Sequence, residues 1–347
     1  MQPDCIIPWE ALPRAHGEPP ATARLRAWPE DFVVDEVLGF EPAGRGQHVL
    51  LRVRKRGVNT QWLARELARC CGVAPVAVGF SGLKDRNAVT TQWLSVDLAG
   101  RPEPEWAGLP IPGVEVLAAH RHDRKLRRGA HRANRFDLLL RGVRGDPAAL
   151  EARLGRLREA GAPNYFGEQR FGAEGANPAK ALEMLTGGRR VRDRGERGIY
   201  LSAARAVVFN RVLAARVVAG NWDRALPGEV LMIDGRHSRF LAEDLTREIA
   251  ARVGAGELHP TGPLWGRGEA ETRGEARRQE EAELVACAAW LPALESAGLE
   301  QDRRALRVLP REMTWEWAAP DELRVGLTLA AGAYATAVLR EVAEYLA

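Results

Sequence analysis

Lysine is nearly absent from this sequence, since only Lys55, Lys84, Lys125 and Lys180 occur among its 50 basic residues. The positive charge is therefore almost entirely arginine, whose planar guanidinium forks onto phosphates and stacks on bases. A GC-rich genome also favours arginine, alanine and glycine, and such a bias explains the total better than the clustering. The net charge is only +4, so composition alone does not require a nucleic-acid partner.

Cysteine is also scarce, and its spacing gives little support to either a disulfide or a zinc site. No pair has CxxC spacing, and no histidine stands at metal-ligand spacing from a cysteine. The pair His120 and His122 lacks a third ligand nearby, so we expect phosphate contacts or surface positions there. We predict no metal. The cysteines are Cys5, Cys70, Cys71 and Cys287.

Long apolar runs are missing as well. The longest candidate, residues 327–339, is too short to span a bilayer and is followed at once by Arg340 and Glu341. The first thirty residues lack the basic start and apolar run of a signal peptide. We therefore expect a cytoplasmic protein without a membrane partner. Because no heptad or long apolar edge is present, we expect a monomer.

The first half of the chain alternates strand-like and helix-like patterns, as in an α+β domain. A helix is expected to begin at Asn59 or Thr60 and to stop at Gly72. Another should begin at Asp146 and Pro147 and close at Gly161. The expected strands are 31–37, 48–54, 76–80, 88–96 and 135–143.

Beyond residue 165 the pattern becomes largely helical, with Gly- and Arg-rich loops between the helices. Strand patterns return near residue 306, and the chain should end in a helix that carries Val338, Leu339, Val342 and Leu346. We therefore expect residues 1–163 and 306–347 to form one discontinuous domain, with a mainly helical domain, 164–305, inserted in it. The helical segments expected there are 178–186, 203–219, 242–253 and 276–290.

A dense basic segment lies at residues 120–135, where Asp123 is the only acid. So many like charges repel one another unless an anionic partner neutralises them, and nucleic acid is the natural partner. The alternative is a solvated loop. The basic residues of this segment are Arg121, Arg124, Lys125, Arg127, Arg128, Arg132 and Arg135.

The loop 164–172 reads NYFGEQRFG and sets Tyr165, Phe166 and Phe171 beside Arg170. Aromatic rings next to arginine can stack on unpaired bases, which favours RNA or single strands. The same rings could instead belong to a core next to a hinge. The pattern alone favours neither.

The turn GFSGLKDRNAVTTQW, residues 79–93, joins two expected strands and carries Lys84, Asp85 and Arg86 in succession. A nucleophilic carboxylate needs orientation and a partly dry pocket, and Lys84 or Arg86 could supply a directional partner for Asp85. A solvated charged turn is the alternative. No second carboxylate nearby in sequence completes a pair of catalytic acids.

Several stretches together resemble the tRNA pseudouridine synthase D family. GLKDRNAVTTQW is similar to that family's signature turn, and NYFGEQRFG is almost identical to its second block. The resemblance continues through PEDFVVDEVLGFEPAG, HDRKLRRGAHRANRFDLLLR, RDRGERGIYLSAAR, HPTGPLWG and LTLAAGAYATAVLRE, and so spans nearly the whole chain.

The resemblance implies a pseudouridine synthase catalytic domain on a mixed, mostly antiparallel sheet, interrupted by a mainly helical TRUD domain. It implies isomerisation of uridine 13 of tRNA to pseudouridine, without cofactor or metal. Asp85 falls on the family's catalytic aspartate, Phe136 on an aromatic ring that contacts the base, and Asn134 on an amide that helps hold the aspartate. Arg26 falls where a relative carries lysine. Lys84 and a water molecule are candidates for the base that removes the C5 proton.

Two other functions fit the same features. A non-catalytic RNA-binding protein would use the arginines and aromatic rings alone, and a synthase of this fold could act on a different RNA uridine. We expect tRNA contacts at Arg26, Arg170 and the basic segment.

Overall fold

The structure is a computed structural model that describes residues 5–98 and 100–346. The chain divides into two compact units. The sheet unit comprises Pro20–Pro147, Pro310–Gly332 and Ala343–Ala347, and the helical unit comprises Met1–Pro19, Ala148–Leu309 and Ala333–Val342. Among the described residues, no helix is both long and apolar enough to cross a membrane.

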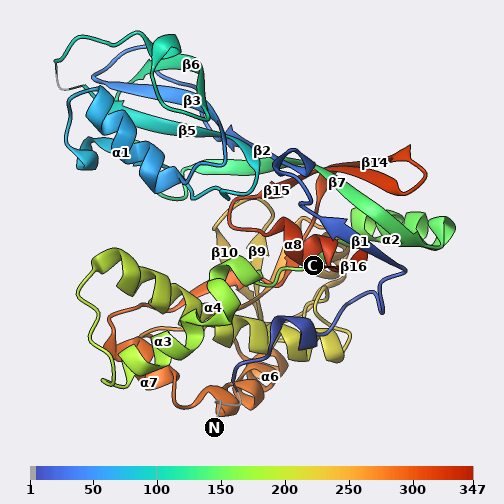
Figure 1. The fold of residues 1–347 in the computed structure, drawn as a ribbon. Coiled ribbons are helices and arrows are strands. Elements are labelled where there is room, and N and C mark those ends of the chain that lie inside the picture. Colours follow the sequence, from blue (N-terminus) through green and yellow to red (C-terminus); the bar gives the residue numbers. More distant parts are fainter. Residues whose placement is uncertain (1–4, 99, 347) are drawn as a thin grey trace. The chain divides into compact units, whose positions relative to one another are not determined.

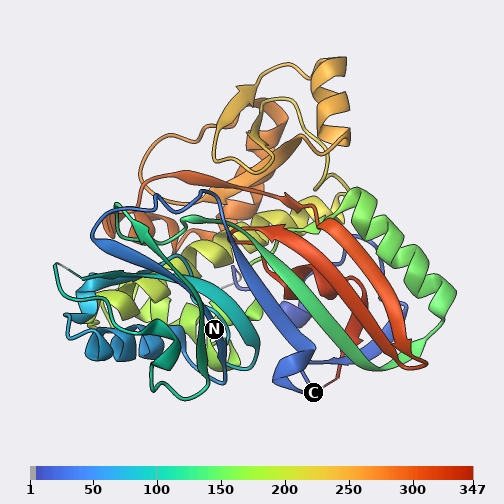
Figure 2. The same cartoon turned by 90° about the horizontal axis from the view of Figure 1, so that it is seen from above.

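The sheet unit is built on ten strands in one mixed sheet, with the main order β14-β15-β7-β2-β5-β3-β6. Two further strands, β1 and β16, pair with each other and join at β7, and β4 pairs with β5. Among the described strands of this sheet, only the β2–β5 and β1–β16 pairs are parallel. Figure 2 shows the twist of β7, β15 and β14, drawn in green to red. The strands are β1 (Ala21–Leu25), β2 (Phe32–Leu38), β3 (His48–Arg56), β4 (Val78–Phe80), β5 (Val89–Asp97), β6 (Val114–His122), β7 (His131–Gly145), β14 (Arg311–Ala319), β15 (Glu322–Ala330) and β16 (Ala343–Tyr345).

Alternating apolar residues explain the register of the central strands. On β7, Phe136, Leu138 and Leu140 are buried, as predicted, because successive side chains of a strand point to opposite faces. On β2 the buried face carries Phe32, Val34 and also Glu36. A carboxylate on a core face needs partners, and the candidate site supplies them.

One helix covers part of this sheet (Figure 1). Helix α1 (Thr60–Cys70) begins as predicted, because the Asn59 Oδ1 accepts hydrogen bonds from the main-chain N–H groups of Gln61 (2.8 Å) and Trp62 (3.3 Å). Its apolar face packs on side chains of β3, β4 and β5. Three short 3-10 helices complete the unit: η2 (Pro29–Asp31), η3 (Pro75–Ala77) and η4 (Trp106–Gly108).

The helical unit is organised around a 25-residue helix, α4, whose apolar side packs against α3, α7 and the segment around Cys287. Figure 1 shows α3 running beside α4. The helices are α2 (Pro147–Ala160), α3 (Asn177–Leu185), α4 (Arg194–Val218), α5 (Arg247–Gly254), α6 (Gly274–Leu284), α7 (Leu291–Ser296) and α8 (Ala335–Leu339), with the 3-10 helices η1 (Trp9–Ala11), η5 (Glu168–Arg170), η6 (Ala173–Gly175) and η7 (Val285–Cys287).

The helical unit also contains strands that the sequence analysis missed. Four of them form a sheet in the order β10-β9-β11-β12, and two form a small sheet. The helix predicted for 242–253 starts only at Arg247, because Ala242 ends a strand. These strands are β9 (Glu229–Ile233), β10 (Arg239–Ala242), β11 (Leu258–Leu264), β12 (Asp302–Ala305), β8 (Ala162–Pro163) and β13 (Arg307–Val308).

The C-terminal end differs from the prediction too. The expected terminal helix is only the five residues of α8, and the chain then enters β16 beside β1. The α+β class and the mixed, mostly antiparallel sheet are confirmed. The compact units do not follow the predicted domain bounds, since the helical unit also takes in Met1–Pro19 and residues 148–163. The division into catalytic and inserted domains, at 163/164 and 305/306, stays a prediction.

Cysteine pairing also differs from the prediction. Cys5 and Cys287 form a disulfide within the helical unit, with Cα atoms 4.7 Å apart and a sequence separation of 282 residues. No local spacing reveals such a pair, so the spacing of the cysteines in the sequence gives it little support. Cys70 and Cys71 are free, and burial, with Cys70 contributing, raises the pKa of the Cys71 thiol to about 11.

Candidate functional site

Asp85 lies in the turn between β4 and β5, where its carboxylate is partly exposed and firmly held. Its Oδ1 accepts a hydrogen bond from the main-chain N–H of Asn87 (3.0 Å). Its Oδ2 forms an ion pair with Nη1 of Arg26 at 2.8 Å, and the side chains of Arg26 and Asp85 are 23% and 28% exposed. The carboxylate is thus oriented on both oxygens and still reaches solvent.

Arg26 connects this carboxylate to an aromatic pair. It lies between β1 and β2 with a left-handed backbone (φ 62°), and its guanidinium stands over the Phe32 ring, 4.0 Å from the centroid. Phe32 packs edge-on against Phe136, with ring centroids 6.0 Å apart. Arg26, predicted only as an RNA contact, is therefore the cation that orients Asp85.

The two cations beside Asp85 in sequence have other partners, which corrects the expectation that Lys84 or Arg86 orients the carboxylate. The Lys84 ammonium pairs with Glu36, and both side chains are buried. The Arg86 Nε donates to the main-chain oxygen of Gly57 (3.1 Å). Adjacent residues of a tight turn point in different directions, so neighbours in sequence need not meet.

Glu36 is the main residue that the sequence analysis missed. Besides pairing with Lys84, its Oε1 accepts from the hydroxyl of Ser81 (2.6 Å) and from the main-chain N–H of Trp93 (3.1 Å). Through Lys84, Ser81 and Trp93, Glu36 therefore ties β2 to the turn and to β5. The alternating pattern of DFVVDEV could have identified it, because Glu36 falls on the same strand face as the buried Phe32 and Val34.

Asn134 lies opposite Glu36 in the β2–β7 register, and its amide contacts His131 rather than Asp85. The distance from Asn134 Nδ2 to His131 Nε2 is 3.3 Å. Burial lowers the pKa of His131, while the neighbouring charges oppose each other, since Glu36 raises that pKa and Lys84 lowers it. Within the described residues, Asn134 Oδ1 and His131 Nδ1 are buried without a hydrogen-bond partner. The predicted role of Asn134 in holding Asp85 stays a prediction.

Phe136 is buried, with 7% of its surface exposed. It is one of the residues around a hollow of about 270 Å³ on β7, β15 and β14. The residues lining this hollow are Arg135, Phe136, Asp137, Glu312, Thr314, Gly326, Leu327 and Thr328.

The basic segment 120–135 leaves β6 and enters β7, and part of its charge is already engaged. Arg121 pairs with Glu103 (2.6 Å), and the Lys125 ammonium donates to the main-chain oxygen of Val76. Arg128 lies over the Phe80 ring at 4.1 Å, and burial lowers its pKa.

Arg128 and the remaining arginines of the segment are nevertheless exposed. Arg124 is 80% exposed and pairs with its neighbour Asp123 at 3.3 Å. Arg127 and Arg132 are exposed, and Arg135 lies 3.4 Å from Glu312. The segment thus presents several guanidinium groups to solvent, as an anion-binding surface requires.

His122 is buried, contrary to the expectation of a phosphate contact or a surface position. Its ring stacks on Phe40 (5.2 Å), and its Nδ1 accepts the main-chain N–H of Ala43 (3.1 Å). His120 lies beside Trp93. Among the described residues, no three or more His, Cys, Asp or Glu side chains are grouped to hold a metal ion.

The aromatic residues of the loop 164–172 belong to the core of the helical unit. Tyr165 and Phe166 are buried in a cluster around α4. Arg170 is fixed beside them, because its Nε donates to the Tyr334 hydroxyl and its Nη1 to the Ser202 hydroxyl, each at 2.9 Å. Of the two alternatives that the sequence left open, the core explanation is correct for Tyr165 and Phe166. RNA contact by Arg170 stays a prediction.

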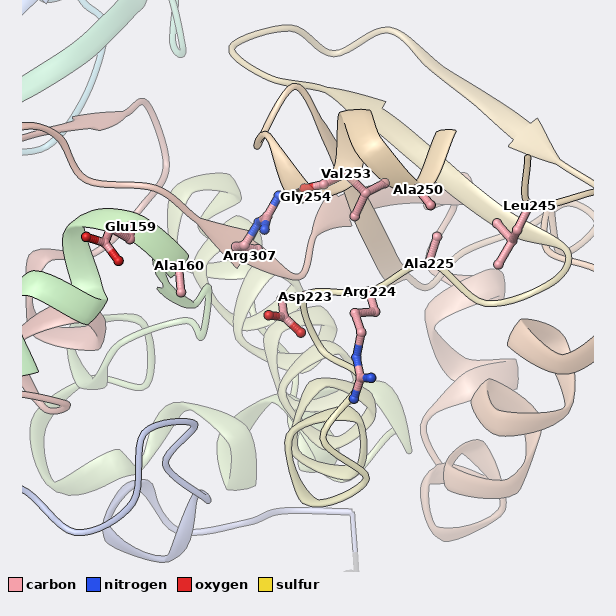
Figure 3. Close-up of a pocket in the computed structure, with 10 residues that line it drawn as sticks. All are labelled: Glu159, Ala160, Asp223, Arg224, Ala225, Leu245, Ala250, Val253, Gly254 and Arg307. Atoms are coloured by element: carbon pink, nitrogen blue, oxygen red, sulfur yellow. Dashed lines mark hydrogen bonds between the residues drawn. The ribbon is translucent and has the colours of Figure 1, made fainter. Parts of the chain in front are cut away.

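A cavity of about 490 Å³ lies in the helical unit (Figure 3). Arg307 is its buried cation, and this guanidinium already donates to His259 Nδ1 (3.2 Å) and to the main-chain oxygen of Val253 (2.5 Å). The cavity contains none of the predicted site residues. Its lining is Glu159, Ala160, Asp223, Arg224, Ala225, Leu245, Ala250, Val253, Gly254 and Arg307.

Comparisons with known proteins agree on one family. The family model described as tRNA pseudouridine synthase D (TruD) matches residues 13–187 and 190–342. The tRNA pseudouridine synthase D of Methylococcus capsulatus is 48% identical over 343 residues, covering 99% of this chain and 97% of the relative. That of Nitrosococcus oceani is 51% identical over 329 residues, covering 94% and 92%. A solved structure named for the same family, from Methanosarcina mazei, matches the fold with a TM-score of 0.65 at 20% identity, covering 95% of each chain.

Proposed function

The chain belongs to the tRNA pseudouridine synthase D family, and on that premise we propose that it isomerises uridine 13 of tRNA to pseudouridine with Asp85 as the nucleophile. As a member of this family the protein is an isomerase, a tRNA pseudouridine synthase. The choice of uridine 13 and the part played by Asp85 are the proposal. The observation that carries it is the Asp85 carboxylate, held by Arg26 at 2.8 Å and by the Asn87 N–H at 3.0 Å while it still reaches solvent.

The proposed reaction breaks one bond to the sugar and forms another. The Asp85 carboxylate attacks the uridine at the anomeric carbon or in the ring, and the bond from N1 to the sugar breaks. Uracil turns within the site, C5 bonds to the anomeric carbon, and the carboxylate is released. C5 loses a proton and N1 gains one, so the product is an isomer of the substrate and no oxidant or cofactor is consumed.

Arg26 supports this chemistry by holding the Asp85 carboxylate in one direction. An uncharged residue at position 26 would leave the carboxylate oriented by the Asn87 N–H alone. The Asn87 N–H is a neutral donor, whereas the guanidinium adds the attraction of an opposite charge at 2.8 Å, so the ion pair is expected to contribute more to the orientation.

Recognition of the base is proposed at Phe136 and Asn134. They are two residues apart on β7, so their side chains lie on the same face, about 6 to 7 Å apart along the strand. Extruding a base costs a few kcal/mol, and one aromatic contact returns about 1 to 3 kcal/mol. The buried Asn134 Oδ1, which lacks a partner among the described residues, suits the polar edge of a pyrimidine. Phe136→Ala should lower turnover, and unchanged kinetics would remove the ring from the mechanism.

Binding of tRNA is proposed along the basic segment 120–135. An aromatic contact only just offsets the extrusion of the base, so phosphate contacts must supply much of the affinity. The exposed residues Arg124, Arg127 and Arg132 suit this role. A tRNA substrate is met in the cytoplasm, and we expect the protein to act there as a monomer, which light scattering with and without tRNA would test.

The experiment is tritium release from a tRNA transcript labelled at C5 of uridine, comparing the wild type with Asp85→Asn. We expect release by the wild type without added cofactor, none by Asp85→Asn, and similar tRNA affinity for both. Asp244→Asn is the matched control, because it removes an exposed carboxylate of the helical unit, away from the proposed site, and should stay active.

A second transcript with cytidine in place of uridine 13 tests the position. Loss of release with this transcript supports uridine 13, whereas continued release identifies a synthase for another uridine. Binding without release from either transcript by the wild type would favour the non-catalytic RNA-binding alternative.

A further inference from the structure

Lys55 is a fully buried lysine directly beneath the turn that carries Asp85. It lies on β3 opposite Thr90 of β5 and Val114 of β6, and only 1% of its surface is exposed. Burying an ammonium is costly unless its hydrogens find partners. A lysine at such a position therefore calls for a specific role.

The ammonium of Lys55 binds two main-chain carbonyls. Its Nζ donates to the oxygen of Val58 (2.7 Å) and to the oxygen of Asp85 itself (2.9 Å). Val58 stands just before α1, so Lys55 joins the start of that helix to the turn. The Arg86 Nε makes a parallel link to the main-chain oxygen of Gly57 (3.1 Å).

Separate contacts therefore hold the side chain and the main chain of Asp85. Arg26 and the Asn87 N–H hold the carboxylate, while Lys55 holds the main chain from which the carboxylate extends. Without the lysine, the Asp85 carbonyl loses this donor and the turn is free to shift. Displacing a reacting group by about 1 Å can cost on the order of 100-fold in rate.

We propose that Lys55 is a positioning residue for Asp85, which anchors the main chain of the turn so that the carboxylate meets the nucleotide in one orientation. The inference rests on the proposed role of Asp85 as the nucleophile. Lys55 touches neither the substrate nor the reacting atoms in this assignment.

The surroundings of Lys55 also predict a pH dependence. Burial lowers its pKa to about 8, the Asp85 charge opposes this shift, and the Lys84 charge adds to it. The other charges around the turn are Arg26, paired with Asp85, Glu36, paired with Lys84, and Arg86 at Gly57. Above about pH 8 Lys55 becomes a neutral amine, its hydrogen bonds weaken, and kcat should decline.

The test compares Lys55→Met with Lys55→Arg and the wild type. Methionine is an apolar side chain of similar length, but it leaves the Val58 and Asp85 carbonyls without this donor, so the unfolded fraction is measured alongside kcat. Arginine keeps the charge and the donors. Lys180→Met, on α3 of the helical unit, is the matched control and should behave as the wild type.

We expect Lys55→Met to lower kcat on the order of 100-fold with tRNA affinity within about twofold of the wild type, and Lys55→Arg to recover part of the loss. The decline of kcat above about pH 8 should disappear in Lys55→Met. A kcat equal to that of the wild type, or a loss that follows the unfolded fraction, would overturn the inference.

Amide hydrogen exchange gives a readout that does not depend on activity. The turn 81–88 should exchange faster in Lys55→Met than in the wild type, while α4 is unchanged. Equal exchange at the turn in Lys55→Met and the wild type would overturn the positioning role, whatever the kcat of the variant. A wild type that releases no tritium would instead overturn the proposed function, so the two failures are distinguishable.

Discussion

Replacing Glu36 by glutamine should destabilise the sheet unit more than any surface substitution, because it leaves the Lys84 ammonium buried without its counter-charge. Glu36 is 2% exposed and accepts from Lys84, Ser81 and Trp93. The glutamine amide has one acceptor oxygen in place of two and adds an N–H₂ group near the ammonium. Breaking a buried ion pair from one side costs about 3–5 kcal/mol, a large part of a typical stability of about 5–15 kcal/mol.

The reverse substitution should cost less. Lys84→Met leaves the Glu36 carboxylate with the Ser81 hydroxyl (2.6 Å) and the Trp93 N–H (3.1 Å), and hydrogen bonds to a charged group are worth about 1.5–3 kcal/mol each. The double variant Glu36→Gln, Lys84→Met removes both charges. Its stability should therefore lie above that of Glu36→Gln alone, with a coupling of about 1–3 kcal/mol.

The assay is urea unfolding followed by circular dichroism for the wild type, both single variants and the double variant. Glu66→Gln on α1 is the control, because its partner Arg69 is 69% exposed and exposed pairs contribute little. Additive effects of the two single variants would refute the buried pair. A Lys84→Met protein as stable as the wild type but without turnover would return Lys84 to the catalytic role that the sequence suggested.

Two further predictions concern pH and salt. Burial lowers the pKa of His131 below its usual value, so the unfolded chain binds a proton more readily than the folded one. Stability should therefore fall as pH drops through and below about 6.5. His131→Leu should lose less stability than the wild type between about pH 7 and pH 5, and equal losses in the two proteins would contradict this. Charge reversal at Arg127 and Arg132 should weaken tRNA binding and lower the slope of log K against log salt by about one for each phosphate that the protein no longer neutralises. The control Arg278→Glu on α6 should change neither the affinity nor the slope. An unaltered slope after charge reversal at Arg127 and Arg132 would place the segment away from the RNA.

The sequence by itself determined the local features of this protein. Alternating apolar residues placed β3, β5 and β7, and Asn59 marked the start of α1. The turn around Asp85 appeared between two strands as expected. Such features depend on residues within a few positions of one another, so the periodicities of about 2.0 and 3.6 residues and the capping residues suffice to predict them. The matching blocks along the chain identified the family for the same reason, since each is a contiguous string of residues.

Only the tertiary structure decided which side chains meet. The pairing of Asp85 with Arg26, of Lys84 with Glu36 and of Cys5 with Cys287 joins residues far apart in sequence. Each depends on strand register, on the path of a turn or on helix packing, and no local pattern encodes these. Burial decided the rest: it placed Tyr165 and Phe166 in a core and Lys55 beneath the candidate nucleophile, because a side chain's environment is set by every segment packed around it.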